Sequence, residues 1–267
     1  MKDITLLNKQ TYLKKTLLGR MANDSFYYGE LNKIALSSSS LKLLLESPKK
    51  YYYVTKYGNN EETQPLRDGF LLHTLVLEPQ KFDELHFVDV ASKNTKKYKE
   101  AKEEFGKVYT SKEKKDAERL ADALLRNEKA LQLIGDAQHE VPAIGMVQGF
   151  PFRGKADILG KNRICDLKTC SDIKNFKWSA KKYGYDIQTY LYCELFDVHW
   201  LDMSFLVLDK GSLDVGVFEI SEEFFEAGKQ KVTQAINIYK EYFENKDIMN
   251  DDFSDVLDNY YITEKLK

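Results

Sequence analysis

The sequence predicts an α/β or α+β protein with a central mixed β-sheet flanked by helices. Helical patterns fill the first half, and then three β-type runs, a helix, two further strands and a long amphipathic helix follow one another. The β-type runs and the helix between them cover residues 139–147, 150–159, 163–169, 186–196, 203–208 and 215–220. Strands that alternate with helices in this way form a sheet covered by helices.

Length and composition predict one elaborated globular domain. The chain has 267 residues, of which 43% are apolar and 31% charged, as is ordinary for a globular protein with a substantial core. We expect a single domain over residues 1–267, with its core at about residues 36–245. The N-terminal extension 1–30 and the acidic C-terminal tail 247–267 are expected to be peripheral.

Charge, hydropathy and cysteine content argue against several classes of protein. The net charge of −2 does not suit a protein that coats polyanions, although an enzyme can confine positive potential to one channel. No segment resembles a signal peptide, and no run approaches the length of a membrane span. The three cysteines, Cys165, Cys170 and Cys193, are too few for a disulfide framework or a four-cysteine cluster. We therefore expect a cytoplasmic protein with no membrane partner.

The N-terminal half begins with a weak helical pattern over residues 5–18, which ends at Gly19. Four serines precede apolar positions in residues 37–48, so one of them is expected to cap a helix. The alternative is that hydroxyls and free amides at this helix start hold a phosphate. Ser47 and Pro48 then open a second helix.

A largely buried helix is predicted over residues 66–78, with Gly69 and His73 one turn apart on one face. A lone histidine on such a helix is usually a core residue, and the pattern alone leaves a ligand role open. Residues 92–107 carry many charges and little apolar periodicity, which predicts either a solvated loop or a contact with nucleic acid. A capping box at residues 110–113 opens a further helix.

The most informative stretch is a predicted hairpin, with strands at residues 155–159 and 163–168. Asp157 lies near the end of the first strand, and Asp166 and Lys168 share one face of the second because strand side chains alternate. Charges within an apolar strand are costly unless they are paired or bound to metal. Two carboxylates beside an ammonium suit a magnesium-dependent phosphodiesterase. The alternative is a partly exposed salt bridge between Asp166 and Lys168.

Residues 149–155 match the spacing of a phosphate-binding loop, with four residues between Gly149 and Gly154 and then Lys155. The next residue is Ala156, where such a loop needs Ser or Thr to hold magnesium, and the following residues have a strand pattern. We therefore expect no nucleotide cofactor.

Together these motifs resemble the PD-(D/E)XK nuclease superfamily in its RecB-like branch, and most closely the RecE-type phage exonucleases. The resemblance covers about residues 36–208 in the family's order. It rests on the helix start at 37–48, the glycine–histidine helix at 69–79, Glu140, Asp157, the Asp166-Leu167-Lys168 motif, and Gln188 and Tyr192 one turn apart. Ala156 stands where the family has proline. The iron–sulfur members need four cysteines, so no iron–sulfur cluster is expected.

The resemblance implies a restriction-endonuclease-like core that binds Mg²⁺, with Mn²⁺ as a substitute. The implied metal ligands are His73, Glu140, Asp157, Asp166 and the carbonyl group of Leu167. The implied catalytic residues are Glu140, Asp157, Asp166, Lys168, Gln188 and Tyr192. Lys168 would orient or deprotonate the attacking water, and Glu140 would help to hold a second ion. Gln188 and Tyr192 would position the phosphodiester or Lys168.

Two segments are expected to contact DNA. The resemblance places the helix start at residues 37–48 near the substrate end, and the segment 172–183 interleaves lysines with aromatic residues. Cations bind phosphates, and aromatic rings can stack on frayed bases. The expected contacts come from Ser37, Ser39, Lys174, Lys177, Trp178, Lys181 and Lys182.

We expect a Mg²⁺-dependent deoxyribonuclease that degrades one strand from duplex DNA ends, 5′ to 3′, and leaves single-stranded DNA for homologous recombination. The expected partners are DNA ends and a RecT-like strand-annealing protein. The resemblance also implies a homo-oligomeric ring, with a tetramer as first choice and a trimer next. Two alternatives stay open, namely a structure-specific or RNA-directed nuclease of the same fold and a non-catalytic nucleic-acid-binding module.

Overall fold

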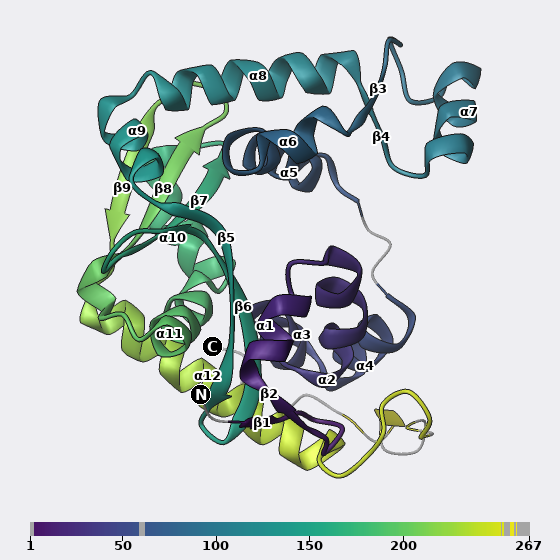
Figure 1. Ribbon diagram of the computed structural model, residues 1–267, viewed down its shortest axis with the longest axis vertical. Helices are drawn as coiled ribbons and strands as arrows, with labels where there is room; N and C mark the ends of the chain where they lie inside the picture. Colours follow the sequence, from purple (N-terminus) through teal and green to yellow (C-terminus); the bar gives the residue numbers. More distant parts are fainter. Residues whose placement is uncertain (1–2, 59–61, 252, 254–256, 259, 261–267) are drawn as a thin grey trace, which may run out of the picture.

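A five-stranded mixed sheet forms the centre of the molecule (Figure 1). The structure is a computed structural model that describes residues 3–58, 62–251, 253, 257–258 and 260. The strands, in spatial order, are β5 (Gln138–Val147), β6 (Phe150–Leu159), β7 (Ile164–Cys170), β8 (Met203–Asp209) and β9 (Val215–Glu219). Neighbouring strands are antiparallel except β7 and β8, which are parallel and therefore need a crossover. The predicted fold class is confirmed.

Helices cover both faces of this sheet (Figure 1). One layer contains α3 (Ser38–Glu46), α4 (Pro48–Tyr57), α10 (Phe176–Lys182), α11 (Tyr185–Phe196) and α12 (Glu222–Phe243). The other contains α5 (Gln64–Leu77), α8 (Ser111–Leu125) and α9 (Glu128–Gly135). Side chains along β8 point alternately to the two faces of the sheet. Phe205 and Val207 therefore pack in the first layer, and Leu206 and Leu208 in the second.

A small extension projects from the second layer. It consists of α6 (Pro79–Asp83), β3 (His86–Val88), α7 (Lys96–Phe105) and β4 (Val108–Thr110), with β3 and β4 paired in parallel. The prediction of a loop at residues 92–107 is wrong, because most of this segment forms α7. Thr95 caps this helix through a hydrogen bond from the Tyr98 N–H, and Tyr98 packs against Val88 and Val108. One aromatic side chain therefore anchors a helix whose other positions are mainly charged.

The N-terminal residues do not form the expected helix over residues 5–18. They form β1 (Asp3–Thr5), β2 (Thr11–Leu13), α1 (Lys14–Arg20), the π-helix η1 (Ser25–Glu30) and α2 (Leu31–Ile34). A turn that includes Lys9, with φ of 65°, lets β1 and β2 pair. The segment is also not peripheral, because Leu17, Met21 and Phe26 form a core with Ile144 of β5.

The described part of the C-terminal tail is likewise not peripheral. Ile248, Phe253 and Leu257 are buried in the first layer. Residues 252, 254–256, 259 and 261–267 lie outside the described residues, so the expectation for them stays a prediction. Among the described residues, no helix combines the length and hydropathy needed to cross a membrane.

Helices α11 and α12 approach each other closely at Gly228. A Cβ atom at this position would lie 2.0 Å from the carbonyl oxygen of Asp186. The absence of a side chain thus allows α12 to pack directly against the first turn of α11. This contact supports the helix that carries Gln188 and Tyr192.

Candidate active site

The candidate site begins where strands β6 and β7 separate. The two strands form ladder pairs beside the turn. One step further in the same register, Asp157 lies opposite Asp166, and the Asp157 carboxylate accepts a hydrogen bond from the Leu167 N–H at 2.9 Å. A side-chain bond thus takes the place of a backbone ladder bond. The predicted hairpin therefore brings the two carboxylates to neighbouring positions.

Glu140 joins this pair from β5. The register of β5 and β6 is continuous on both sides of Glu140 and places it opposite Asp157. Opposite residues of antiparallel strands have Cβ atoms about 4.5–5.5 Å apart. Glu140 also has a φ of 51°, which is uncommon for a residue other than glycine. Strained backbone of this kind clusters at functional sites, where the surrounding structure must hold it.

His73 reaches the same place from α5. Its Nε2 lies 2.6 Å from the carbonyl oxygen of Leu167, so Nε2–H donates to that oxygen. Its Nδ1 lies 3.5 Å from Oδ2 of Asp157. The histidine is therefore held at the separated strands and is not enclosed among apolar side chains. Its role as a metal ligand stays a prediction.

The residues at this point fit a divalent cation. His73, Glu140 and Asp157 each offer one ligand atom, and the three atoms lie within 4.8 Å of one another. The carbonyl oxygen of Leu167, beside His73, adds a further hard donor. Carboxylate and carbonyl oxygens suit Mg²⁺ or Mn²⁺. Of the five predicted ligands, four thus lie together.

Asp166, the fifth predicted ligand, has other partners. Its carboxylate is fully buried, forms an ion pair with Lys168 and accepts a hydrogen bond from the Gln188 side chain. Gln188 thus holds Asp166 in place. The Tyr192 hydroxyl donates to the carbonyl oxygen of Lys155 at 2.8 Å, so it supports the backbone of β6 two residues before Asp157. The structure gives both helix residues positioning contacts.

Glu140 and Asp157 have raised pKa values. Burial, followed by the charge of Asp157, raises the pKa of Glu140 to about 8. Burial, followed by the charge of Asp166, raises the pKa of Asp157 to about 6. Burial alone would lower the pKa of Lys168, but the charges of Asp166 and Asp157 outweigh it and raise that pKa. Burial and mutual repulsion thus make the charged forms of Glu140 and Asp157 costly in the absence of a further cation.

The three metal-binding candidates line a cavity of about 440 Å³. Another part of its wall is the start of α3, with Ser37, Ser38 and Ser39. Ser37 caps α3 by accepting a hydrogen bond from the Ser40 N–H, and its Oγ lies 2.9 Å from Oγ of Ser39. The capping role is therefore present, while the phosphate role of Ser37 and Ser39 stays a prediction.

Several residues of the cavity were missed by the sequence analysis. Arg153 and Lys155 line it together with Asp157, because alternate residues of β6 share one face. Lys155 Nζ lies 3.8 Å from Glu140, so it is a nearby cation. This alternation could have been found in the sequence. Tyr27 and Tyr28 of η1 also line the cavity, and no local pattern places them there.

The basic segment after the hairpin lies on α10 and the preceding turn. None of its residues lines the cavity. Trp178 is exposed, and Lys181 Nζ lies 3.8 Å from Glu223 of α12. Lys174, Lys177 and Lys182 are exposed as well. DNA contacts by these residues therefore stay a prediction.

A mixed sheet whose separated strands carry Asp157 and the Asp166-x-Lys168 motif defines a PD-(D/E)XK-like domain. The family comparison agrees. Residues 37–248 match the model of the PDDEXK-like domain of unknown function (DUF3799), and the chain belongs to this family. The resemblance to the PD-(D/E)XK superfamily is thereby confirmed. No curated protein matches the sequence.

One solved structure supports the same fold. A crystal structure from Eubacterium rectale, described as a "Putative exonuclease", is 16% identical, covers 92% of this chain and 95% of its own, and has a TM-score of 0.62. A phage-related exonuclease from Haemophilus somnus 129PT is 17% identical over 64% of this chain and 92% of its own, with a TM-score of 0.32. At these identities the first similarity concerns the fold alone, and the second score is too low to support an argument.

Proposed function

We propose that the protein is a divalent-metal-dependent nuclease that acts on the ends of duplex DNA as an exonuclease. The observation that carries the proposal is that His73, Glu140 and Asp157 line the same cavity as the start of α3. A helix start offers free N–H groups to a phosphate, and the three side chains offer ligands to a cation. One cavity can thus hold both a phosphodiester and the ion that activates it.

The residues divide the work of phosphodiester hydrolysis. A bound divalent ion would polarise a phosphate oxygen and lower the pKa of a bound water. Asp157 and Glu140 would hold the ion, and the first turn of α3 would hold a phosphate oxygen. Lys168 has a raised pKa and remains an ammonium group at neutral pH. Lys168 is not among the residues that line the cavity; in this proposal its ammonium group orients the water and offsets charge on the phosphate, while Asp166, held by Gln188, fixes its position.

The finer parts of the proposal rest on the family resemblance. They are Mg²⁺ as the natural ion, degradation 5′ to 3′, a role in homologous recombination beside a RecT-like annealing protein, and a cytoplasmic setting. A ring-shaped homo-oligomer, a tetramer or otherwise a trimer, belongs to the same proposal. A ring would gather the lysines of several subunits around one channel and so offset the net charge of −2.

A time course on linear duplex DNA, labelled separately at each end, tests the activity. We expect progressive loss of one labelled strand from its 5′ end with Mg²⁺ or Mn²⁺ and no cleavage with a chelator. Cleavage only of branched DNA or of RNA would replace the substrate assignment. Absence of cleavage of every nucleic acid, with a folded protein and either ion, would contradict the proposal.

Light scattering tests the ring. A mass of about three or four chains is expected at micromolar concentration. A monomer of 31.0 kDa with and without DNA would exclude the ring.

A further inference from the structure

Two exposed aromatic rings stand at the mouth of the candidate site. Tyr28 of η1 is 61% exposed and Phe70 of α5 is 40% exposed. Both line the cavity that contains His73, Glu140 and Asp157. Both also line an adjoining hollow of about 380 Å³. The two rings therefore lie where the site continues into the second hollow.

A buried tyrosine supports each exposed ring. The Phe70 ring lies nearly parallel to that of Tyr109, with an interplanar angle of 7° and centroids 6.0 Å apart. The Tyr28 ring meets Tyr27 edge to face, with centroids 4.8 Å apart. Tyr27 and Tyr109 are 5% and 0% exposed. Buried partners of this kind restrict the rotamers of the exposed rings. Lysine ammonium groups also lie over them, with Lys107 Nζ 4.2 Å from the Phe70 centroid and Lys155 Nζ 5.6 Å from the Tyr28 centroid, so a base that stacks here displaces flexible lysine side chains.

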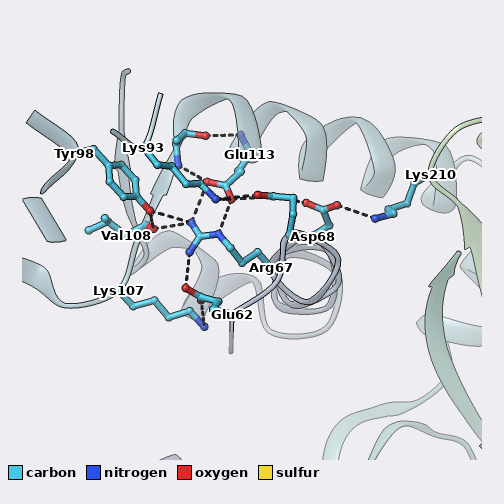
Figure 2. A network of polar contacts seen from close by, with 11 residues as sticks. Glu62, Arg67, Asp68, Lys93, Tyr98, Lys107, Val108, Glu113 and Lys210 are labelled. Atoms are coloured by element: carbon cyan, nitrogen blue, oxygen red, sulfur yellow. Dashed lines mark hydrogen bonds and ion pairs between the residues drawn. The ribbon is translucent and has the colours of Figure 1, made fainter. Parts of the chain in front are cut away.

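Each buried tyrosine is in turn covered by an arginine. The Arg67 guanidinium carbon lies 4.4 Å from the centroid of Tyr109, and that of Arg153 lies 4.4 Å from the centroid of Tyr27. Figure 2 shows how Arg67 is fixed, with bonds to Glu113, Glu62 and the carbonyl oxygen of Val108. Cation–π contacts with a planar guanidinium suit such stacks. Phe70 thus ends a stack of planar groups, whereas Tyr28 meets its buried partner edge to face at an interplanar angle of 82°.

The charges of the second hollow favour a neutral ligand over a phosphate. Glu78 and Glu84 contribute carboxylates to its lining. Its two lysines already have acidic partners, since Lys81 Nζ lies 2.8 Å from Glu78 and Lys155 Nζ lies 3.2 Å from Asp24. Carboxylates repel a phosphate but do not repel an uncharged base. A flat uncharged group can contact the aromatic rings of this lining without the repulsion that a phosphate would meet.

We propose that Tyr28 and Phe70 form a stacking platform for the nucleobase attached to the phosphate held in the cavity. This inference rests on the proposed nuclease function and adds how a base is received at the site. Aromatic stacking on a base tolerates any sequence, because every base has a π-face. The platform therefore serves an enzyme that must accept each nucleotide in turn.

The test compares 5′-phosphorylated duplexes that carry either normal or abasic nucleotides at the last two positions of the cleaved strand. For the unaltered protein, the abasic end should raise KM about tenfold, which corresponds to about 1.4 kcal/mol of lost stacking. Tyr28→Leu and Phe70→Leu keep an apolar side chain but remove the ring. Each should weaken this discrimination, and the double variant should abolish it. Tyr28→Phe retains the ring and should behave as the unaltered protein.

Tyr53→Leu is the matched control, because Tyr53 is 49% exposed on α4 and does not line either hollow. It should leave the discrimination unchanged. Equal discrimination in the double variant and the unaltered protein would overturn the platform while leaving the nuclease function intact. Thermal unfolding of each variant identifies any that fail to fold.

A binding measurement keeps the platform testable without cleavage. An oligonucleotide with 2-aminopurine at its 5′ end, in calcium and without magnesium, should lose fluorescence on binding because the base stacks. The double leucine variant should bind it without that loss. Absence of any fluorescence change with the unaltered protein, at saturation, would exclude the platform whether or not the protein cleaves DNA.

Discussion

Helix α5 lies beside two buried groups of charged side chains, in which the carboxyl pKa values are shifted in opposite directions. In the first, Arg67 Nε donates to Glu113 Oε1 at 2.6 Å and Lys93 Nζ lies 2.9 Å from the same oxygen (Figure 2). Burial would raise the pKa of Glu113, but hydrogen bonds from Arg67 and other donors hold it well below its usual range. In the second, Asp157 and Glu140 have raised pKa values.

The difference in pKa reflects the neighbours of each carboxylate. Glu113 is surrounded by donors from its own chain, including the Thr110 N–H and Gln64, so its charge is neutralised within the fold. Asp157 and Glu140 are buried and repel each other and Asp166, and the cations beside them offset these effects only in part, because both pKa values stay raised. Glu113 is thus neutralised by its own chain, whereas buried carboxylates that keep raised pKa values are suited to bind a cation. Four predictions test this contrast.

The largest effect is expected on catalysis. Lys168→Ala and Asp166→Ala should each reduce cleavage by at least about a hundredfold, because they remove the cation beside the phosphate or the group that holds it. Lys93→Ala is the matched control from the paired group and should leave the rate within about twofold. End-labelled DNA measures both rates. Normal cleavage by the Lys168 and Asp166 variants would place the active site elsewhere.

The next effect concerns stability. Arg67→Ala should lower the free energy of unfolding by about 3–5 kcal/mol, because it leaves the buried charge of Glu113 without its main partner. Asp157→Asn, measured without metal, should not lower it, because the substitution removes a repelling charge and keeps an oxygen to accept from the Leu167 N–H. Urea unfolding measures both. Similar losses in the two variants would contradict the contrast.

A pH dependence follows from the raised carboxyl pKa values. A carboxyl group whose pKa is higher in the folded state binds protons more tightly there, so its contribution to stability is lost as pH rises. For Asp157 and Glu140 this loss of stability takes place between about pH 4 and about pH 8. The melting temperature of the metal-free protein should therefore fall as the pH rises from 4 to 8. Added Mg²⁺ should raise the melting temperature more at pH 8 than at pH 5.

Asp157→Asn is the control for this measurement and should weaken both dependences, while the part that the burial of Glu140 causes remains. An equal response to Mg²⁺ at the two pH values would show that protons and the metal ion do not compete for these carboxylates.

The smallest effect compares two histidines. His73→Ala should raise the Mg²⁺ concentration needed for half-maximal cleavage about tenfold, because one ligand is lost. His139→Ala is the matched control, since its Nε2 also lies near a backbone carbonyl oxygen, that of Ile134, at 2.9 Å. It should lower thermal stability without changing the metal requirement. If the His73 variant also shows an unchanged metal titration, His73 is a structural residue.

Much of the fold could be predicted because its signals are local. The strands from residue 138 to residue 219 and helices α11 and α12 follow alternation and helical periodicity, which depend on neighbours two to four positions away. The helix starts at Ser37, Ser47 and Thr110 follow from capping chemistry in the same way. The hairpin motif likewise identified the position of Asp157, Asp166 and Lys168 from a few residues.

The wrong predictions for residues 92–107 and for the N-terminal segment have a different cause. Nothing near Tyr98 in the sequence shows that it would pack on Val88 and Val108 and so turn an expected loop into a helix. The N-terminal segment likewise gains its core from Ile144, more than a hundred positions away. In both cases packing against other elements outweighs weak local propensity.

By itself, the sequence determined the class of the protein and the chemical groups available to it. Only the tertiary structure decided which groups meet. It placed Glu140 opposite Asp157 through strand register, His73 beside Leu167 through helix packing, and Tyr28 and Phe70 around one cavity. The physical reason is that side-chain chemistry and periodicity are properties of short segments, whereas the charge balance and shape of a site depend on contacts between distant ones.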